Sequence, residues 1–168
     1  MKKSKIQNVA LLAMMAALTA VSTMFLKLPQ GLLVANGYVN LGDTLLMLAA
    51  FLLGPLAGFT AGSLGSALAD LVSGCAIYAP ITFIVKGLEG LICGLIYKKM
   101  KRKYALLAAL PAGLFMVFGY FIGEIFLYGV EGALASIFGN TVQGVVNAVL
   151  AVLLNEVLKK TPVKYLNN

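Results

Sequence analysis

Long apolar runs, separated by only a few residues, occupy almost the whole of this 168-residue chain. Hydrophobic residues make up 61% of the sequence and charged residues only 11%, a balance that a soluble domain of this size does not need. A membrane-spanning helix takes roughly 20 apolar residues, so the chain has room for about six spans with short loops. We therefore expect an all-α integral membrane protein, a single domain over residues 1–168 folded as a six-transmembrane-helix bundle. The expected spans are 9–27, 41–54, 56–73, 80–97, 104–128 and 133–158.

The first apolar run and the loop after it each allow two interpretations. Lysines precede the run, as in a signal peptide, but its length and the further spans favour a retained first helix. In the loop 28–40, Pro29 and Gly31 break the helix, and Asn36-Gly37 between apolar pairs is a type I′ hairpin signal. We expect a short hairpin-like outer loop between the first two helices, which either covers a pocket or is an inert connector.

Basic residues gather at three places along the chain, which gives the sequence a net charge of +7. The three clusters lie at the N-terminus, after the fourth expected span and after the sixth. An even number of spans separates them, so they fall on one side of the membrane, and the positive-inside rule places both termini in the cytoplasm. No aromatic residues are interleaved to stack bases, so nucleic acid is not expected as a partner. The clusters are Lys2, Lys3 and Lys5; Lys98, Lys99, Lys101, Arg102 and Lys103; and Lys159, Lys160 and Lys164.

Several kinds of chemistry find no support in the sequence. The chain has no histidine, which excludes histidine-based zinc sites and histidine acid–base catalysis. Its two cysteines, Cys75 and Cys93, have no metal-binding or redox spacing. No phosphate-binding G-x-x-x-x-G-K-[ST] motif occurs, so the chain does not hydrolyse ATP itself. The expectation is a protein that is not an enzyme and needs no cofactor or metal.

Ionisable residues inside the apolar runs point to a polar site within the bundle. Each costs on the order of 3 kcal/mol or more at bilayer depth, so Asp43, Asp70, Lys86 and Glu89 are expected to face the interior. Lys86 with Asp70 or Glu89 forms either a structural ion pair or part of a ligand pocket. The pocket alternative is supported by a second feature, the polar stripe at helical period on the last expected helix.

The candidate substrate site combines these residues with neighbouring aromatic ones, and it is expected to open outward. Amide side chains offer both a donor and an acceptor, and tyrosines offer an aromatic face for a small polar ring. The expected substrate-binding residues are Asn36, Tyr38, Tyr78, Lys86, Glu89, Tyr120, Glu124, Tyr128, Asn140, Gln143 and Asn147.

Small residues at four-residue spacing form a ridge on the first helix. Ala13 and Ala17 share one line of the helix surface, and Ala16 and Ala20 share the next. Such a ridge lets another helix approach closely. It serves either internal packing or docking to a separate membrane subunit.

Three segments together resemble a known family over nearly the whole chain: the N-L-G-D-T segment at 40–44, the K-G-L-E-G segment at 86–90, and G-N-T-V-Q-G-V-V-N at 139–147. They are similar to the S components of energy-coupling factor (ECF) vitamin transporters, in particular the hydroxymethylpyrimidine and pyridoxine group, which is related to the riboflavin S component. The resemblance implies a subunit of the bacterial cytoplasmic membrane that captures a vitamin or precursor outside the cell. It also implies a transmembrane coupling subunit (EcfT type), two cytoplasmic ATPases, and docking through Ala13, Ala16, Ala17 and Ala20.

Other functions remain as alternatives at this point. A stand-alone proton-coupled secondary transporter would use Asp70, Glu89 or Glu124, but six spans without an inverted repeat weaken that hypothesis. A small membrane enzyme lacks a nucleophile–base set. An S component for riboflavin or another vitamin differs from the first hypothesis only in its ligand.

Overall fold

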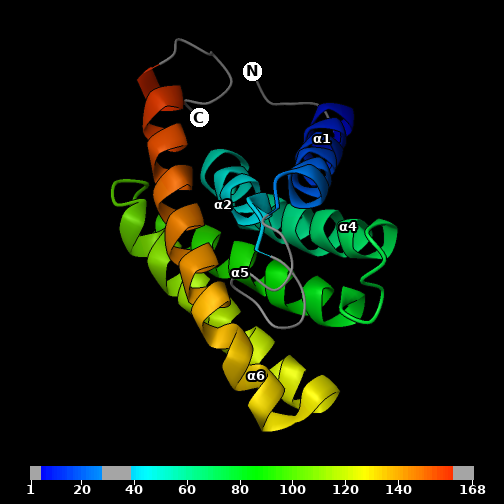
Figure 1. Ribbon diagram of the computed structural model, residues 1–168. Helices are drawn as coiled ribbons and strands as arrows, with labels where there is room; N and C mark the ends of the chain where they lie inside the picture. The colour runs from blue at the N-terminus through cyan, green and yellow to red at the C-terminus, as the bar shows by residue number, and fades with distance from the viewer. Residues whose placement is uncertain (1–4, 28–38, 161–168) are drawn as a thin grey trace.

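The computed structural model describes residues 5–27 and 39–160, and helices make up all the regular elements of these residues (Figure 1). A single antiparallel bridge pairs Lys27 with Asn40, so the two ends of the intervening loop meet at its base. The expected hairpin itself, with Asn36 and Tyr38, lies outside the described residues. The helices are α1 (Lys5–Phe25), α2 (Gly42–Leu53), α3 (Pro55–Thr60), the π-helical η1 (Ala61–Ser66), α4 (Ala67–Val72), α5 (Ala79–Lys99) and α6 (Leu106–Lys160).

The division into elements differs from the six separate helices that we expected. The third expected span is one continuous rod of three pieces, α3, η1 and α4, because its middle turn is π-helical. The fifth and sixth expected spans both belong to α6, whose backbone leaves helical geometry only at Gly129 (φ 75°, ψ 178°). A break was expected over 129–132, but one glycine with positive φ is enough to turn the chain.

The turn at Gly129 divides α6 into two arms that lie side by side. The first arm covers residues 106–128 and the second covers 130–160. A Cβ atom added at Gly113 in the first arm would lie 3.0 Å from the carbonyl oxygen of Gly144 in the second. Figure 1 shows the second arm returning, in yellow to red, along the first, so that α1 begins and α6 ends toward the same end of the bundle.

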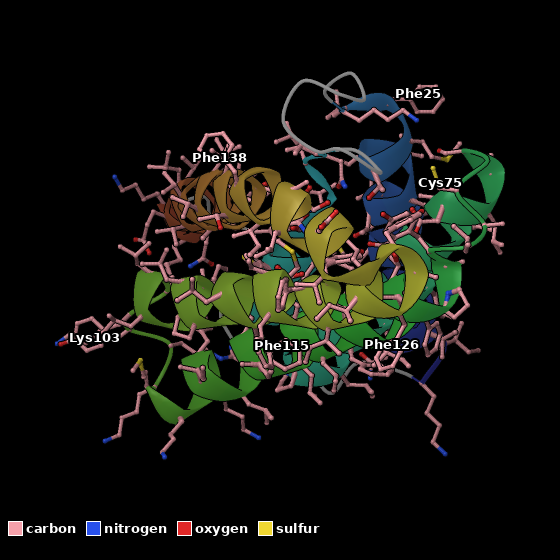
Figure 2. All side chains as sticks on the ribbon, turned by 60° about the horizontal axis from the view of Figure 1, so that its bottom comes forward. Phe25, Cys75, Lys103, Phe115, Phe126 and Phe138 are labelled. Atoms are coloured by element: carbon pink, nitrogen blue, oxygen red, sulfur yellow. The ribbon has the colours of Figure 1, made fainter. Side chains whose placement is uncertain are left out.

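The lengths and surfaces of the helices are those of a membrane protein. Within the described residues, α1, α5 and α6 are long and apolar enough to cross a membrane, whereas α2 has only 12 residues. Large apolar side chains lie on the outside of the bundle: Phe25 is 74% exposed, Phe126 83% and Phe138 66%, and Figure 2 shows all three at its edge. In water such a surface would be unfavourable, whereas lipid tails solvate it.

The interior has an apolar part and a polar part. The apolar core gathers side chains from α1, the body of α2, the second half of α5 and both arms of α6, among them Leu46, Met47, Cys93 and Tyr97. The polar part uses the first turn of α2, the first half of α5 and the regions of α6 nearer to Gly129. Most buried charges and amides lie in this polar part, whereas Asn155, near the end of α6, is buried beside Tyr97 in the apolar part and donates to its hydroxyl at 3.2 Å.

Close packing of the α3–η1–α4 rod against α5 positions the centre of this polar part. Gly62 in η1 lies against the backbone of α5, and a Cβ atom at that position would overlap with the carbonyl group of Lys86. Small residues in membrane helices let backbones meet in this way. The contact fixes the part of α5 from which the Lys86 side chain extends.

Candidate functional site

A buried ion-pair network lies at the centre of the polar part. Lys86 is 2% exposed, and its Nζ atom lies 2.5 Å from Asp43 Oδ1 and 3.4 Å from Glu89 Oε2. The sequence placed Glu89 beside Lys86, as the structure does, but it did not identify Asp43 as the closest partner. Asp43 lies in the first turn of α2, so the ion pair ties α2 to α5. Since Asp43 and Lys86 are both buried, removing Lys86 would leave Asp43 without its counter-charge.

The polar stripe of the last helix pairs with the start of α2 through its amides. Asn147 Oδ1 accepts hydrogen bonds from the Thr44 backbone N–H (3.0 Å) and the Thr44 hydroxyl (2.6 Å). Asn147 Nδ2 donates to the carbonyls of Asn40 (2.9 Å) and Gln143 (2.8 Å). Gln143 accepts from the Asn40 N–H at 3.0 Å and donates to Asp43 Oδ2 at 2.8 Å. We call Asn40, Asp43, Thr44, Gln143 and Asn147 the amide seam.

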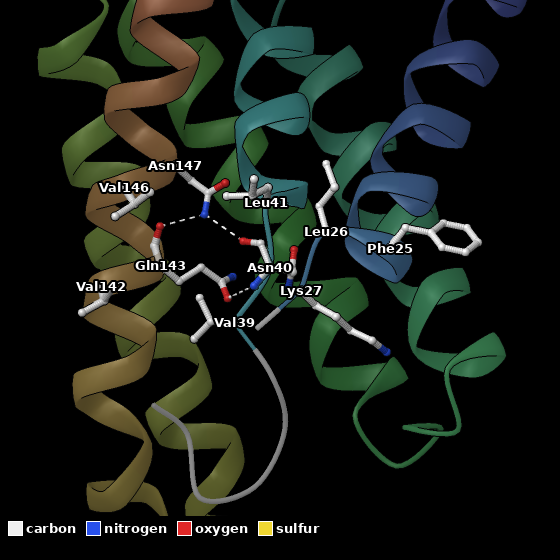
Figure 3. A pocket seen from close by; sticks show the side chains of 10 residues that line it. All are labelled: Phe25, Leu26, Lys27, Val39, Asn40, Leu41, Val142, Gln143, Val146 and Asn147. Carbon is white, nitrogen blue, oxygen red and sulfur yellow. Dashed lines mark hydrogen bonds between the residues drawn. The ribbon is translucent and has the colours of Figure 1, made fainter. Parts of the chain in front are cut away.

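A pocket of about 390 Å³ lies beside the amide seam, between the end of α1, the segment before α2 and the second arm of α6 (Figure 3). Its walls are largely apolar and include Leu26, Val39 and Val146. Figure 3 shows Gln143 and Asn147 extending from α6 toward Asn40, with their hydrogen bonds along the pocket wall. The polar groups of this wall already bond to one another.

A second group of predicted site residues lies between α5 and the first arm of α6. Tyr78, at the start of α5, donates its hydroxyl to Glu124 Oε1 at 3.2 Å. Its ring centroid is 6.4 Å from that of Tyr120 and 6.1 Å from that of Tyr128. Glu124 is 2% exposed and Tyr78 is 8% exposed, whereas Tyr128 is 38% exposed. We call Tyr78, Tyr120, Glu124 and Tyr128 the tyrosine–carboxylate cluster.

Lys86 connects the two groups. Its ammonium lies 5.4 Å from the centroid of the Tyr120 ring, a distance at which a cation is attracted to an aromatic face. The Tyr120 hydroxyl in turn bonds to the hydroxyl of Thr82, one turn before Lys86, at 2.9 Å. The polar part is therefore continuous from Asn147 through Asp43 and Lys86 to the tyrosines.

Some buried polar atoms of this region have no hydrogen-bond partner among the described residues. These include Glu124 Oε2 and both carboxylate oxygens of Glu89, although Glu89 still lies near Lys86. The Ser136 hydroxyl lies between two acceptors, the Glu124 carboxylate and the Gly132 carbonyl oxygen, which is 3.5 Å away. Asn140 is 7% exposed, and no hydrogen bond of its amide to another described residue is found. An unsatisfied buried acceptor is costly, so such atoms are candidates for contact with a ligand or water.

Three seam residues were absent from the predicted substrate site: Asn40, Asp43 and Thr44. The signal for them was present in the N-L-G-D-T segment, where polar residues directly precede an apolar run. Asp70, which the sequence offered as a partner of Lys86, is buried on α4 and makes other contacts. In the described parts of the chain, no group of three or more Cys, Asp or Glu side chains is arranged to hold a metal ion.

The alanine ridge is divided between the outside and the inside of the bundle. Ala13 and Ala17 are exposed on α1, whereas Ala20 is 6% exposed and Ala16 is partly buried. The backbone of Ala16 lies against Gly65 of η1. A Cβ atom added at Gly65 would lie only 2.5 Å from the Ala16 carbonyl oxygen. One line of the ridge therefore packs internally and the other faces outward.

Two solved structures that superpose on nearly the whole of this chain are S components. One, from a study of the structure and mechanism of the S component of a bacterial ECF transporter, superposes with a TM-score of 0.71 at 23% identity, covering 93% of this chain and 97% of that one. Another, the S component for biotin from an ECF-type ABC transporter, gives a TM-score of 0.70 at 18% identity and covers 97% of both chains. At these identities the match establishes the fold.

Sequence comparisons identify the family. The chain is 39% identical over 142 residues to an uncharacterized protein of Pyrococcus woesei, covering 83% of this chain and 93% of that protein. It is 32% identical over 162 residues to the thiamine precursor transporter HmpT of Lactococcus lactis subsp. cremoris, covering 96% and 93%. The family described as ECF-type riboflavin transporter, S component, matches residues 3–160. The chain therefore belongs to the S components of ECF-type transporters, a family of membrane transport subunits.

Proposed function

We propose that this chain captures a small vitamin or vitamin precursor, hydroxymethylpyrimidine or pyridoxine, outside the cell for ATP-driven import. The observation that carries the proposal is the tyrosine–carboxylate cluster, where a buried carboxylate with an unpaired oxygen lies among three tyrosines. A single heteroaromatic ring needs an aromatic surface and a few fixed polar groups in an otherwise apolar site. The thiamine precursor transporter named above, similar over nearly the full length, supports this ligand class.

Riboflavin is the second candidate ligand, because the matching family bears the name of riboflavin transporters. Its three-ring system differs greatly in size from one pyrimidine or pyridine ring. Mass spectrometry of the ligand that accompanies the purified protein tests both candidates. We expect a hydroxymethylpyrimidine or pyridoxine; recovery of riboflavin alone would contradict the first proposal and support the second.

The six-span arrangement and its orientation belong to the same proposal. We propose that α1, α2, the α3–η1–α4 rod, α5 and the two arms of α6 are the six spans, with both termini in the cytoplasm. Cysteines introduced at Lys101 and Lys160 should then resist an impermeant thiol reagent on intact cells, while one at Ile77 in the loop before α5 should react. The background should lack Cys75 and Cys93. Native Cys75 is a poor probe, since burial and then the nearby Asp70 raise the pKa of its thiol. Labelling at 101 and 160 but not at 77 would reverse the orientation.

The outward-facing line of the alanine ridge is proposed as the contact for a transmembrane coupling subunit that works with two ATPase subunits. Ala13 and Ala17 leave a smooth, exposed surface on which another helix approaches closely. Ala17→Leu should prevent copurification of the coupling and ATPase subunits while ligand binding is retained. Val21→Leu, at an exposed position one turn further along α1, is the control. Loss of ligand binding with an intact complex would contradict this assignment, and a wild-type protein that never copurifies an ATPase would favour the secondary-transporter alternative.

A further inference from the structure

Within the proposed function, on which this inference rests, Glu124 is a candidate contact for the ligand. Glu124 lies on the first arm of α6, 2% exposed, in a part of the protein where a carboxylate is expensive to bury. The hydroxyl of Tyr78 holds one of its oxygens at 3.2 Å. The other oxygen, Oε2, has no hydrogen-bond partner of good geometry among the described residues, although the Ser136 hydroxyl lies beside the carboxylate.

The surroundings of Glu124 determine which kind of ligand group could bind to its Oε2 atom. Lys86, the nearest cation on α5, is paired with Asp43 at 2.5 Å and Glu89 at 3.4 Å, so its charge is already balanced by carboxylates. Among the described residues, no lysine or arginine forms an ion pair with Glu124. The missing partner of Oε2 is therefore a hydrogen-bond donor, and a donor with positive charge would be favoured further.

The shape of the surroundings favours a flat donor. Tyr78 donates to the carboxylate, and its ring packs against two further tyrosine rings, with centroids 6.4 Å away for Tyr120 and 6.1 Å away for Tyr128. Rings at such distances pack against one another, and a planar ligand ring would pack on this aromatic group with its edge toward the carboxylate. A planar edge with adjacent N–H groups meets both oxygens of a carboxylate at once, the arrangement in which such pairs are strongest.

We propose that Glu124 binds the amino edge of a 4-aminopyrimidine and so selects this class over pyridoxine. The exocyclic amino group donates an N–H to Oε2, as the amino group of cytosine donates to acidic side chains. The adjacent ring nitrogen, when protonated, donates to Oε1, which still has a lone pair after accepting from Tyr78. Pyridoxine carries hydroxyl groups but no amino group beside its ring nitrogen, so it cannot form this pair.

Calorimetric titration of the purified full-length protein with three probes tests the inference. The probes are 4-amino-5-hydroxymethyl-2-methylpyrimidine, its analogue with oxygen in place of the 4-amino group, and pyridoxine. The wild type should bind the amino compound about 100-fold more tightly than the oxo analogue, because the oxo group faces the carboxylate without a donor. Glu124→Gln should weaken binding of the amino compound by roughly 10- to 100-fold. It should bind the oxo analogue as tightly as the wild type does or more tightly, since the amide of glutamine can donate to the oxo group.

Matched variants separate recognition from folding. Glu131→Gln removes an exposed carboxylate from the same helix and should leave all affinities unchanged. If circular dichroism shows that Glu124→Gln is unfolded, Glu124→Asp is the substitute: it keeps the charge and should bind the amino compound more weakly while still preferring it to the oxo analogue.

An equal loss of affinity for both probes in Glu124→Gln, or no preference between them in the wild type, would overturn the inference, because water would then satisfy Oε2. Tighter binding of pyridoxine than of the amino compound would overturn it and leave the proposed function standing. Binding of none of the probes would overturn both.

Discussion

The amide seam and the tyrosine–carboxylate cluster are built from similar residues but differ in how completely their polar atoms are paired. In the seam, both amide atoms of Asn147 take part in four hydrogen bonds. In the cluster, Glu124 has one hydrogen bond from Tyr78 and an oxygen without a partner. Asn147 and Glu124 are both buried, at 0% and 2% exposed, so exposure does not distinguish these two side chains.

The difference separates polar residues that hold the bundle together from polar residues that remain able to bind a ligand. A buried amide whose donors and acceptors are satisfied contributes to stability, whereas an unsatisfied acceptor costs about 1–3 kcal/mol until something binds it. By this criterion Asn147 and Gln143 join the last helix to α2, and Glu124 and Asn140 are the better candidates for ligand contact. Lys86 lies between the two regions. We group it with the amide seam, because its closest partner, Asp43, is a seam residue.

The largest effect is expected for Lys86→Ala. Removing the ammonium leaves Asp43 and Glu89 buried without a counter-charge, which should cost about 3–5 kcal/mol of unfolding free energy. Because the chain has no tryptophan, thermal unfolding in detergent is best followed by circular dichroism. Lys98→Ala, at an exposed position of the same helix, is the control. A stable Lys86→Ala protein that only loses ligand binding would place Lys86 in the binding site instead.

Asn147→Ala is expected to come next. The change leaves the Thr44 N–H and the Asn40 carbonyl without their partners, at about 1–3 kcal/mol for each group. The melting temperature should fall clearly, and any loss of ligand affinity should follow from loss of folded protein. A variant of wild-type stability that binds ligand 10- to 100-fold more weakly would move the ligand site to the pocket beside the seam.

The smallest change in stability is expected for Asn140→Ala, on the same face of the same helix. Its amide makes no hydrogen bond to another described residue, so the free energy of unfolding should fall by less than in Asn147→Ala. If the ligand uses this amide, affinity should fall about 10-fold or more, measured by calorimetric titration. Asn140→Ala and Asn147→Ala thus form a matched pair with opposite expectations. Equal losses of stability in the two variants would remove the distinction between the regions.

Much of the molecule could be predicted from the sequence because lipid restricts the choices. Apolar runs that must satisfy their own backbone groups become helices, as they do in the described part of the chain. The resemblance to S components rested on short segments around buried polar residues, and the family comparison confirms it. The helical period also placed Asn140, Gln143 and Asn147 on one face of the last helix, as the structure does.

The tertiary structure decided which of these residues meet. Periodicity shows that residues share a helix face, but it does not show which other helix that face contacts. Asn40 and Gln143 are 103 positions apart, as are Thr44 and Asn147, and no local pattern links them. The same limit applies to Asp43 with Lys86 and to the division of the alanine ridge into an inner and an outer line. Whether a buried polar atom is satisfied depends on distances and angles between helices, and only the packed bundle fixes these.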